Sequence, residues 1–183
     1  MRKGLWTLAA AVVVVGGLIG AKARAFAASD APVAVGSVAP AFTLPSQTDA
    51  NVSLKDYKGK YVVLYFYPKD QTSGCTIEAH NFERDTAKYA ALNTVVLGVS
   101  FDTVDSHKKF CTKDGLNFKL LADPTGKVVS EYGVATMMTP IGKLAKRDTF
   151  LIGPDGKVLK FWAVQDVQTH SEEVLAAIAD MKK

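Results

Sequence analysis

Residues 65–75 read Tyr65-Phe66-Tyr67-Pro68-Lys69-Asp70-Gln71-Thr72-Ser73-Gly74-Cys75 and carry the strongest structural signal in this chain. They close an apolar run, rich in β-branched and aromatic residues, that is typical of a central strand buried on both faces. Pro68 ends the strand, and an amphipathic helix is expected to begin close to Cys75. A cysteine in the first turn of a helix lies near the positive end of the helix dipole and near free backbone N–H groups. This placement favours the thiolate form and indicates redox chemistry.

Strand and helix patterns alternate on both sides of this stretch. Apolar residues at helical spacing predict one helix over residues 76–92, and the apolar run at 94–101 predicts a second buried strand. The turn Gly153-Pro154-Asp155-Gly156 predicts a hairpin near the end of the chain. This order predicts an α/β protein with a mixed sheet flanked by helices. The other expected elements are extended segments at 41–44, 52–54, 118–121, 147–152 and 157–164, and helices that end at 113, 132 and 182.

Composition and charge limit the classes of function. With 183 residues, 48% of them hydrophobic, the chain suits one ordinary domain plus a short leader. Its 22 basic residues include Arg2, Lys3, Lys22 and Arg24, which all precede the first acid, Asp30. Without these four, 18 basic residues face 18 acidic ones, so the folded part is neutral. The neutral balance argues against nucleic-acid binding.

The first 27 residues have the layout of an export signal. Arg2 and Lys3 precede an apolar stretch at 5–20, and Ala25-Phe26-Ala27 offers an A-x-A cleavage site. A helix over that stretch would be about 24 Å long, shorter than the ~30 Å hydrocarbon core of a bilayer. A retained anchor stays open as the alternative. We therefore expect a signal peptide or an N-terminal membrane anchor at 1–27, a linker at 28–35 and the domain at 36–183, exported to the periplasm or held at the outer face of the membrane.

The P-x-x-x-T-x-x-C spacing of Pro68, Thr72 and Cys75 resembles the active-site loop of peroxiredoxins. The surrounding Tyr-Phe-Tyr-Pro-Lys-Asp and Gly-Cys-Thr-x-Glu blocks are most similar to the peroxiredoxin Q, or bacterioferritin-comigratory, branch of the AhpC/TSA family. This resemblance implies a thioredoxin fold, a Cys75 that reduces hydroperoxides, and a thioredoxin-like dithiol as reductant. It also implies a chain that works as a monomer. Similarity extends from about Gly36 to Lys182 and includes Pro40-x-Phe42-x-Leu44, Ser106-His107-x-x-Phe110, Leu121-x-Asp123-Pro124 and Arg147-x-Thr149-Phe150-Leu151-Ile152.

Ionisation alone does not make a cysteine a fast peroxidase. A thiol with a pKa of ~8.5 is about 3% ionised at pH 7, and a pKa of ~6 would raise that fraction about thirtyfold. The nucleophilicity of the thiolate would fall roughly thirteenfold over the same change, so the net gain is about twofold. The remainder must come from hydrogen-bond donors directed at the peroxide oxygens as the O–O bond stretches. By the resemblance, these donors are the Thr72 hydroxyl, the backbone N–H groups of Gly74 and Cys75, and the Arg147 guanidinium, while Pro68 shields the thiolate from water.

Each of these residues also has a purely structural interpretation. Cys75 would then be an inert buried thiol, and Thr72 only the N-cap of a helix. Arg147 would be an exposed residue at the start of a strand. Glu78 is explained equally well as a helix-surface partner of Arg84 or Arg147 and as a functional group.

The second cysteine, Cys111, is predicted to be the resolving partner of Cys75. Many members of the branch carry this partner five residues after the first cysteine, but that position is His80 here. Cys111 suits the other arrangement, with the partner on the next helix, since its offset is 36 (111 minus 75). An intramolecular disulfide between the two needs Cα atoms within about 7 Å, so one or both helices would locally unwind. The structural alternative is that Cys111 packs in the apolar stripe of its helix.

The sequence therefore predicts an exported thiol peroxidase that reduces hydrogen peroxide or small organic hydroperoxides in antioxidant defence. One alternative is a one-cysteine peroxidase with a structural Cys111, and another is a redox sensor or holdase with incidental turnover. A thiol–disulfide oxidoreductase is disfavoured because that activity needs a C-x-x-C motif, and Glu78 stands where its second cysteine would be. The three histidines show no metal-ligand spacing, so neither a metal site nor a cofactor is expected.

Overall fold

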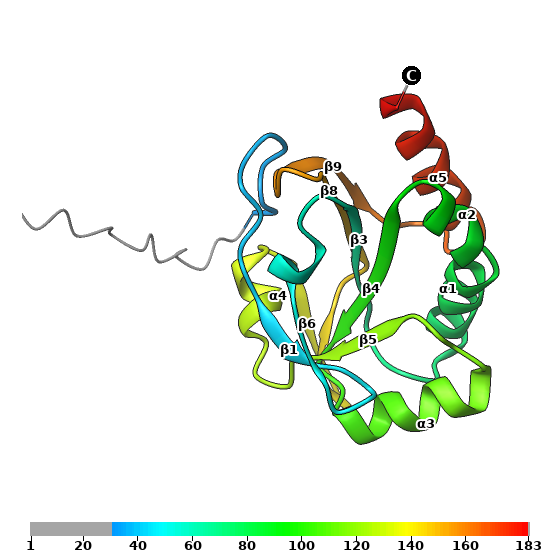
Figure 1. The fold of residues 1–183 in the computed structure, drawn as a ribbon. Helices are drawn as coiled ribbons and strands as arrows, with labels where there is room; N and C mark the ends of the chain where they lie inside the picture. The colour runs from blue at the N-terminus through cyan, green and yellow to red at the C-terminus, as the bar shows by residue number, and fades with distance from the viewer. Residues whose placement is uncertain (1–30, 183) are drawn as a thin grey trace, which may run out of the picture.

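A five-stranded mixed sheet, ordered β5-β4-β3-β8-β9, forms the centre of the molecule (Figure 1). Strand β3 runs parallel to β4, which runs parallel to β5, whereas β8 is antiparallel to both of its neighbours. The expected α/β class with a mixed sheet is confirmed. The strands span Tyr61–Phe66 (β3), Thr94–Ser100 (β4), Lys119–Ala122 (β5), Asp148–Ile152 (β8) and Val158–Ala163 (β9).

Strand β3 separates two apolar cores because its side chains alternate between the faces of the sheet. Val62, Leu64 and Phe66 join the core on one face, while Val63 and Tyr65 join the core on the other. Figure 1 shows α4 on one side of the sheet and α1, α2 and α5 together on the opposite side. The computed structural model describes residues 31–182, so the predicted leader at 1–27 lies outside the described residues.

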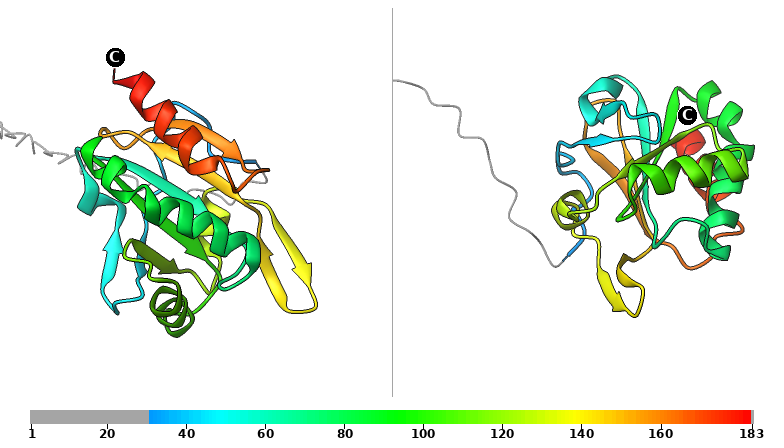
Figure 2. Two further views of the ribbon diagram at one scale, coloured as in Figure 1. Left: turned by 90° about the vertical axis from the view of Figure 1, so that its right-hand side faces the viewer. Right: turned by 90° about the horizontal axis from the view of Figure 1, so that it is seen from below.

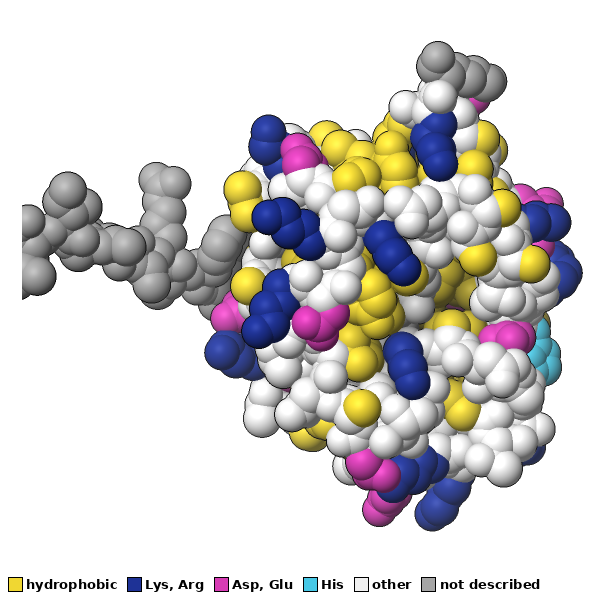
Figure 3. All heavy atoms as spheres, in the orientation of Figure 1, with side chains coloured by type: hydrophobic (Ala, Val, Ile, Leu, Met, Phe, Trp, Pro, Cys, Tyr) yellow, Lys and Arg dark blue, Asp and Glu magenta, His cyan; other side chains and the backbone are white. Residues whose placement is uncertain are grey.

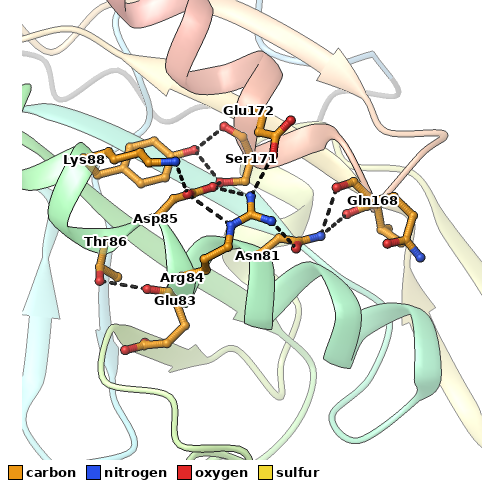
Figure 4. Close-up of polar contacts among 11 residues, drawn as sticks. Asn81, Glu83, Arg84, Asp85, Thr86, Lys88, Gln168, Ser171 and Glu172 are labelled. Carbon is orange, nitrogen blue, oxygen red and sulfur yellow. Dashed lines mark hydrogen bonds and ion pairs between the residues drawn. The ribbon is translucent and has the colours of Figure 1, made fainter.

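The segment after β3 forms two helices, α1 (Ser73–Arg84) and α2 (Thr86–Ala91), and the prediction of one helix over 76–92 is wrong. The chain turns at Asp85, whose carboxylate is fully buried. This carboxylate accepts hydrogen bonds from Arg84 Nη2 at 2.6 Å, Lys88 Nζ at 2.9 Å and Ser171 Oγ of α5 at 2.9 Å (Figure 4). A buried carboxylate requires such donors, and the turn delivers it to them. Asp85 therefore fixes the C-terminal end of α1 against α5.

A small hairpin, β6 (Thr136–Thr139) and β7 (Gly142–Ala145), was not predicted from the sequence and stands out from the body in both views of Figure 2. Most of its residues are exposed, Met138 among them, and only Ala145 at the end of β7 is buried, so the strands show no alternating apolar pattern. The remaining elements are β1 (Thr43–Pro45), β2 (Asn51–Ser53), the 3-10 helix η1 (Leu54–Tyr57), α3 (Val104–Asp114), α4 (Lys127–Glu131) and α5 (His170–Met181).

The surface carries mixed charge. On the face in Figure 3, basic and acidic side chains are interspersed around an apolar hollow of about 300 Å³ that lies between α2, β4 and β5. Across residues 31–182, no helix combines the length and the apolar character that crossing a bilayer demands.

Candidate active site

The predicted site residues converge at one edge of the sheet. Because β3 and β4 are parallel, the loops that follow them leave from the same edge. These loops lead into α1, which carries Cys75, and into α3, which carries Cys111. Strand β8 is antiparallel to β3 and pairs its first residue, Asp148, with Phe66 at the end of β3. Arg147, directly before β8, therefore lies at this edge as well.

Cys75 occupies the first turn of α1, as expected for a cysteine near a helix N-terminus. The helix begins at Ser73, and its N-cap Thr72 has the extended backbone that starts a helix (φ −79°, ψ 149°). The first intrahelical hydrogen bond runs from the N–H of Thr76 to the carbonyl of Thr72 at 2.9 Å. The N–H groups of Gly74 and Cys75 precede that bond, so they have no acceptor within the helix. The Cys75 thiol is free and only 1% exposed.

Arg147 contacts the sulfur directly. Its Nη2 donates to Cys75 Sγ at 3.1 Å, and its Nη1 donates to Glu78 Oε2 at 2.7 Å. Burial lowers the pKa of Arg147, but the negative charges of Cys75 and Glu78 outweigh this effect and raise it. The guanidinium is therefore a fixed cation that is shared between a thiol and a carboxylate. Its side chain is only 20% exposed, which does not fit the interpretation of Arg147 as an exposed residue at a strand start.

Glu78 pairs with Arg147, one of its two predicted arginine partners, but it is buried in the site and does not lie on the helix surface. Burial raises its pKa to about 7, although the charge and hydrogen bond of Arg147 act in the opposite direction. Its Oε1 has no hydrogen-bond partner among the described residues. The sequence signal for this role is the spacing, because residues three apart on a helix share a face and Glu78 is three residues after Cys75.

Gly74 makes room for the guanidinium. A Cβ atom at this position would lie 2.9 Å from Arg147 Nη2, closer than such atoms approach in proteins. Glycine destabilises a helix relative to alanine by about 1 kcal/mol, so its presence here calls for a local reason. Close packing of Arg147 against the helix backbone provides that reason.

Thr72 and Pro68 belong to the loop that presents Cys75. The Thr72 hydroxyl donates to the carbonyl of Lys69 at 3.0 Å, and no hydrogen bond joins it to Cys75 in the described part of the chain. In this state the hydroxyl braces the loop, and its oxygen keeps lone pairs to accept a further hydrogen bond. Pro68 is partly exposed between the end of β3 and the start of α1.

Cys111 lies on α3 as a buried free thiol, in the same apolar cluster as Cys75. Burial raises its pKa to about 12, helped by the negative charges of Asp70, Glu83 and Asp114, while Lys119 acts in the opposite direction. In this structure Cys111 is thus a protonated thiol that packs in the core of the domain.

His80, at the position where many relatives carry the resolving cysteine, joins α1 to α3. Its Nε2 lies 3.4 Å from Asp114 Oδ1, three residues after Cys111. On the same side of α1, Glu83 accepts hydrogen bonds from the N–H of Asn117 at 2.7 Å and from its side-chain amide at 2.8 Å. The His80 contact joins the two cysteine-bearing helices, and the Glu83 contacts join α1 to the segment between α3 and β5. Between residues 31 and 182, no group of three or more ligating side chains could hold a metal ion.

A buried cysteine in the first turn of a helix, hydrogen-bonded to an arginine at the edge of a mixed sheet, is the arrangement expected of a thiol peroxidase of thioredoxin fold. A sequence model of the AhpC/TSA family matches residues 35–161. The chain belongs to the AhpC/TSA family, in its peroxiredoxin Q and Bcp branch, and is a peroxidase of the oxidoreductase class.

Individual relatives agree with this assignment. The chain is 40% identical to peroxiredoxin Bcp of Bacillus subtilis over 154 residues, which cover 82% of this chain and 98% of that protein. It is 39% identical to chloroplastic peroxiredoxin Q of Sedum lineare, over 83% of this chain and 81% of that one. Among solved structures, peroxidoxin BcpB of Mycobacterium tuberculosis has a TM-score of 0.74 at 32% identity, over 81% of this chain and 98% of that chain. A cysteine mutant of Xylella fastidiosa PrxQ has a TM-score of 0.74 at 30% identity, over 80% and 98%.

Proposed function

We propose that the chain reduces hydrogen peroxide and small organic hydroperoxides in a two-cysteine cycle. The Cys75 thiolate attacks the terminal oxygen of the peroxide, the O–O bond breaks, and Cys75 sulfenic acid forms with release of water or an alcohol. Cys111 then condenses with the sulfenic acid to give a disulfide and water. A thioredoxin-like dithiol reduces this disulfide and restores both thiols.

The single observation that carries the proposal is the 3.1 Å hydrogen bond from Arg147 Nη2 to Cys75 Sγ. A permanent cation at this distance stabilises the thiolate, and its planar fork of donors is proposed to bind the peroxide oxygens as well. The N–H groups of Gly74 and Cys75 complete the set of proposed donors. The Thr72 hydroxyl was expected to donate to the peroxide, but it donates its proton to the carbonyl of Lys69, so we propose instead that its oxygen accepts the hydrogen of the bound peroxide.

Two observations support Cys111 as the resolving cysteine. Cys75 and Cys111 share one apolar cluster, so local opening of α1 or α3 does not have to carry either sulfur across the sheet. Solved structures of Xanthomonas campestris peroxiredoxin Q include two cysteine-to-serine mutants, at positions 36 apart in that protein (84 minus 48), which equals the separation of Cys75 and Cys111.

Asp85 restricts the proposed unwinding of α1 to the N-terminal end of the helix. Its bonds to Arg84, Lys88 and Ser171 hold the C-terminal end of the helix, whereas the turn that carries Cys75 lies at the other end. Local unfolding proceeds through the least stable segments, so the first turns of α1 are proposed to unwind while residues 84–91 stay folded.

The cellular setting follows from the leader. We propose that residues 1–27 export the protein, either as a cleaved signal peptide or as an N-terminal membrane anchor, and that residues 28–35 link the leader to the domain. The protein then works as a monomer in antioxidant defence in the periplasm or at the outer face of the membrane. A reductant of the thioredoxin type has to be present in the same compartment.

The test is mass spectrometry of peroxide-treated protein in the absence of reductant, together with steady-state peroxide consumption in the presence of a recycling dithiol. The proposal expects a crosslink between Cys75 and Cys111 and sustained turnover. An overoxidised Cys75 beside a free Cys111 would instead support a one-cysteine peroxidase, and turnover with small thiols would then survive Cys111→Ser. A single turnover followed by arrest would support a redox sensor or holdase.

A further inference from the structure

The proposed condensation requires that Cys111 lose its proton. In that step the S–O bond of the Cys75 sulfenic acid breaks, the S–S bond forms, and the Cys111 proton leaves with the hydroxyl group as water. With a pKa raised to about 12, only about one Cys111 in 10⁵ is a thiolate at pH 7. A base beside Cys111 would remove this obstacle.

His107 is placed to supply that base. It lies on α3 one helical turn before Cys111, at the i, i+4 spacing that puts two side chains on one face of a helix, and both residues are buried. Its Nδ1 lies 2.9 Å from Asp70 Oδ2, and the hydroxyl of Tyr67 donates to Asp70 Oδ1 at 2.7 Å. Asp70 is an acceptor, so Nδ1 carries a hydrogen, and the neutral form of this imidazole has its lone pair on Nε2.

The Nε2 atom of His107 is buried and has no hydrogen-bond partner among the described residues. Buried polar atoms normally have a hydrogen-bond partner, so an unpaired ring nitrogen in the core indicates a role outside structural packing. Asp70 fits the role of an orienting carboxylate. Although burial acts to raise its pKa, the hydrogen bonds from His107, Ser106 and Tyr67 lower it, and an ionised Asp70 stabilises the imidazolium that forms when Nε2 takes a proton.

The other titratable groups around Cys111 suit this role less well. Burial raises the pKa of Tyr65 far above its ordinary value, so its hydroxyl keeps its proton. The Asp114 carboxylate has one buried oxygen, Oδ2, without a hydrogen-bond partner among the described residues, but a carboxylate is a weak base toward a thiol. The groups that face the pair are Asp70 and Tyr67 at His107, and Asp70, Glu83, Asp114 and Lys119 at Cys111.

We propose that His107, oriented by Asp70 and Tyr67, is the general base that removes the Cys111 proton and passes it to the departing hydroxyl of the Cys75 sulfenic acid. This inference rests on the proposed two-cysteine cycle. In the reduced state described here the imidazole makes no hydrogen bond to Cys111. One bridging water relays the proton from Cys111 to Nε2 when α3 loosens, while Nδ1 keeps its hydrogen bond to Asp70.

The experiment is a single-turnover reaction of the full chain with one equivalent of hydrogen peroxide. Rapid acid quench and mass spectrometry then count sulfenic acid and crosslinked protein over time, from pH 5 to pH 9, in wild type and His107→Asn. Asparagine keeps an N–H group for Asp70 but has no basic nitrogen. General-base catalysis contributes about 10²–10⁴-fold, so we expect crosslinking at pH 7 to slow at least a hundredfold. The variant rate should rise about tenfold per pH unit, because hydroxide then removes the proton, whereas the wild-type rate should depend less steeply on pH.

Asp114→Asn is the matched control, since it removes the competing acceptor beside Cys111. It should retain the wild-type pH profile of crosslinking. His107→Ala with added imidazole adds a second readout, because an external base restores a lost base but not a lost structural contact. The inference is overturned if His107→Asn forms the crosslink at the wild-type rate with the wild-type profile, or if Asp114→Asn alone shows the defect. A wild type that forms no crosslink would instead refute the two-cysteine cycle itself.

Discussion

The two cysteines share one apolar core but have opposite electrostatic surroundings. Cys75 lies in the first turn of α1 with the guanidinium of Arg147 against its sulfur. Cys111 lies in the last turn of α3, where the helix dipole is negative, and its charged neighbours are mainly acids. Both thiols are almost fully buried, so burial does not distinguish them. The nearby charge does.

The difference in nearby charge determines which cysteine reacts first in the proposed cycle. A peroxide that enters the site meets one thiol whose anion is stabilised and a second thiol that is held protonated. The second cysteine therefore becomes reactive only after the first is oxidised and the helices open. Substitutions around each sulfur test whether charge, rather than burial or position, makes the two cysteines differ in reactivity.

The largest expected effect comes from replacing each sulfur in turn. Cys75→Ser should abolish peroxide reduction, because a hydroxyl does not ionise near pH 7. Cys111→Ser should still form the sulfenic acid at close to the wild-type rate but should stop before the disulfide. Stopped-flow consumption of peroxide, with mass spectrometry of the product, separates the two outcomes. Equal loss of the first step in both variants would remove the proposed asymmetry.

The second-largest effect should come from removing the positive charge of Arg147, which should slow the formation of Cys75 sulfenic acid. Arg147→Met is expected to slow sulfenic acid formation by about 10²–10³-fold, the usual cost of losing one donor aimed at the transition state. Arg147→Lys should recover only part of the rate, since an ammonium lacks the planar fork that reaches both Cys75 and Glu78. Lys146→Met is the matched control because this neighbouring lysine is exposed. Wild-type rates in Arg147→Met would show that the contact is structural.

Glu78→Gln tests how strongly the positive charge of Arg147 is engaged by the Glu78 carboxylate. Its pKa is about 7 in the folded state against 4.5 in the unfolded chain. Between these values the unfolded chain has lost the proton that the folded protein retains, so this group reduces stability as the pH rises through the window. Glu78→Gln removes the effect. The free energy of unfolding of the variant should gain on that of wild type by about 3 kcal/mol between pH 4.5 and pH 7 and then remain level.

Urea denaturation of both proteins across this pH range measures that difference. Glu83→Gln serves as the control, since it removes a carboxylate from the same helix at a partly exposed site. A difference between wild type and Glu78→Gln that does not change with pH would mean that Glu78 does not titrate in this window.

The sequence predicted the parts of this site that depend on local pattern. The strand, the proline and the helix start around Cys75 follow from neighbouring residues, and the resemblance supplied Arg147. The sequence named Arg147 as one of two partners for Glu78, but helical spacing does not show that the pair is buried beside Cys75. The pairing of His107 with Asp70 joins residues 37 positions apart (107 minus 70), and only the sheet topology brings them together.

The break at Asp85 and the β6–β7 hairpin were missed for related reasons. An aspartate within a helical pattern gives no sign that its carboxylate will be buried against α5, since Ser171 comes 86 residues later. The hairpin strands are exposed, so they lack the apolar alternation that marks a strand in a sequence. Each miss concerns a contact or an exposure that the tertiary fold decides.

The smallest expected effect comes from Gly74, where one methyl group tests the position of the cation. A Cβ atom at residue 74 would lie 2.9 Å from Arg147 Nη2, and the flexible end of the arginine would have to move. Gly74→Ala should therefore slow sulfenic acid formation by roughly tenfold, less than the loss of the donor in Arg147→Met. Helix propensity alone favours the alanine, so the fold should be retained. Ser73→Ala, at an exposed neighbouring position, should leave the rate unchanged. If both variants react like wild type, the arginine adapts to the methyl group, and its exact placement against Gly74 does not set the reactivity of Cys75.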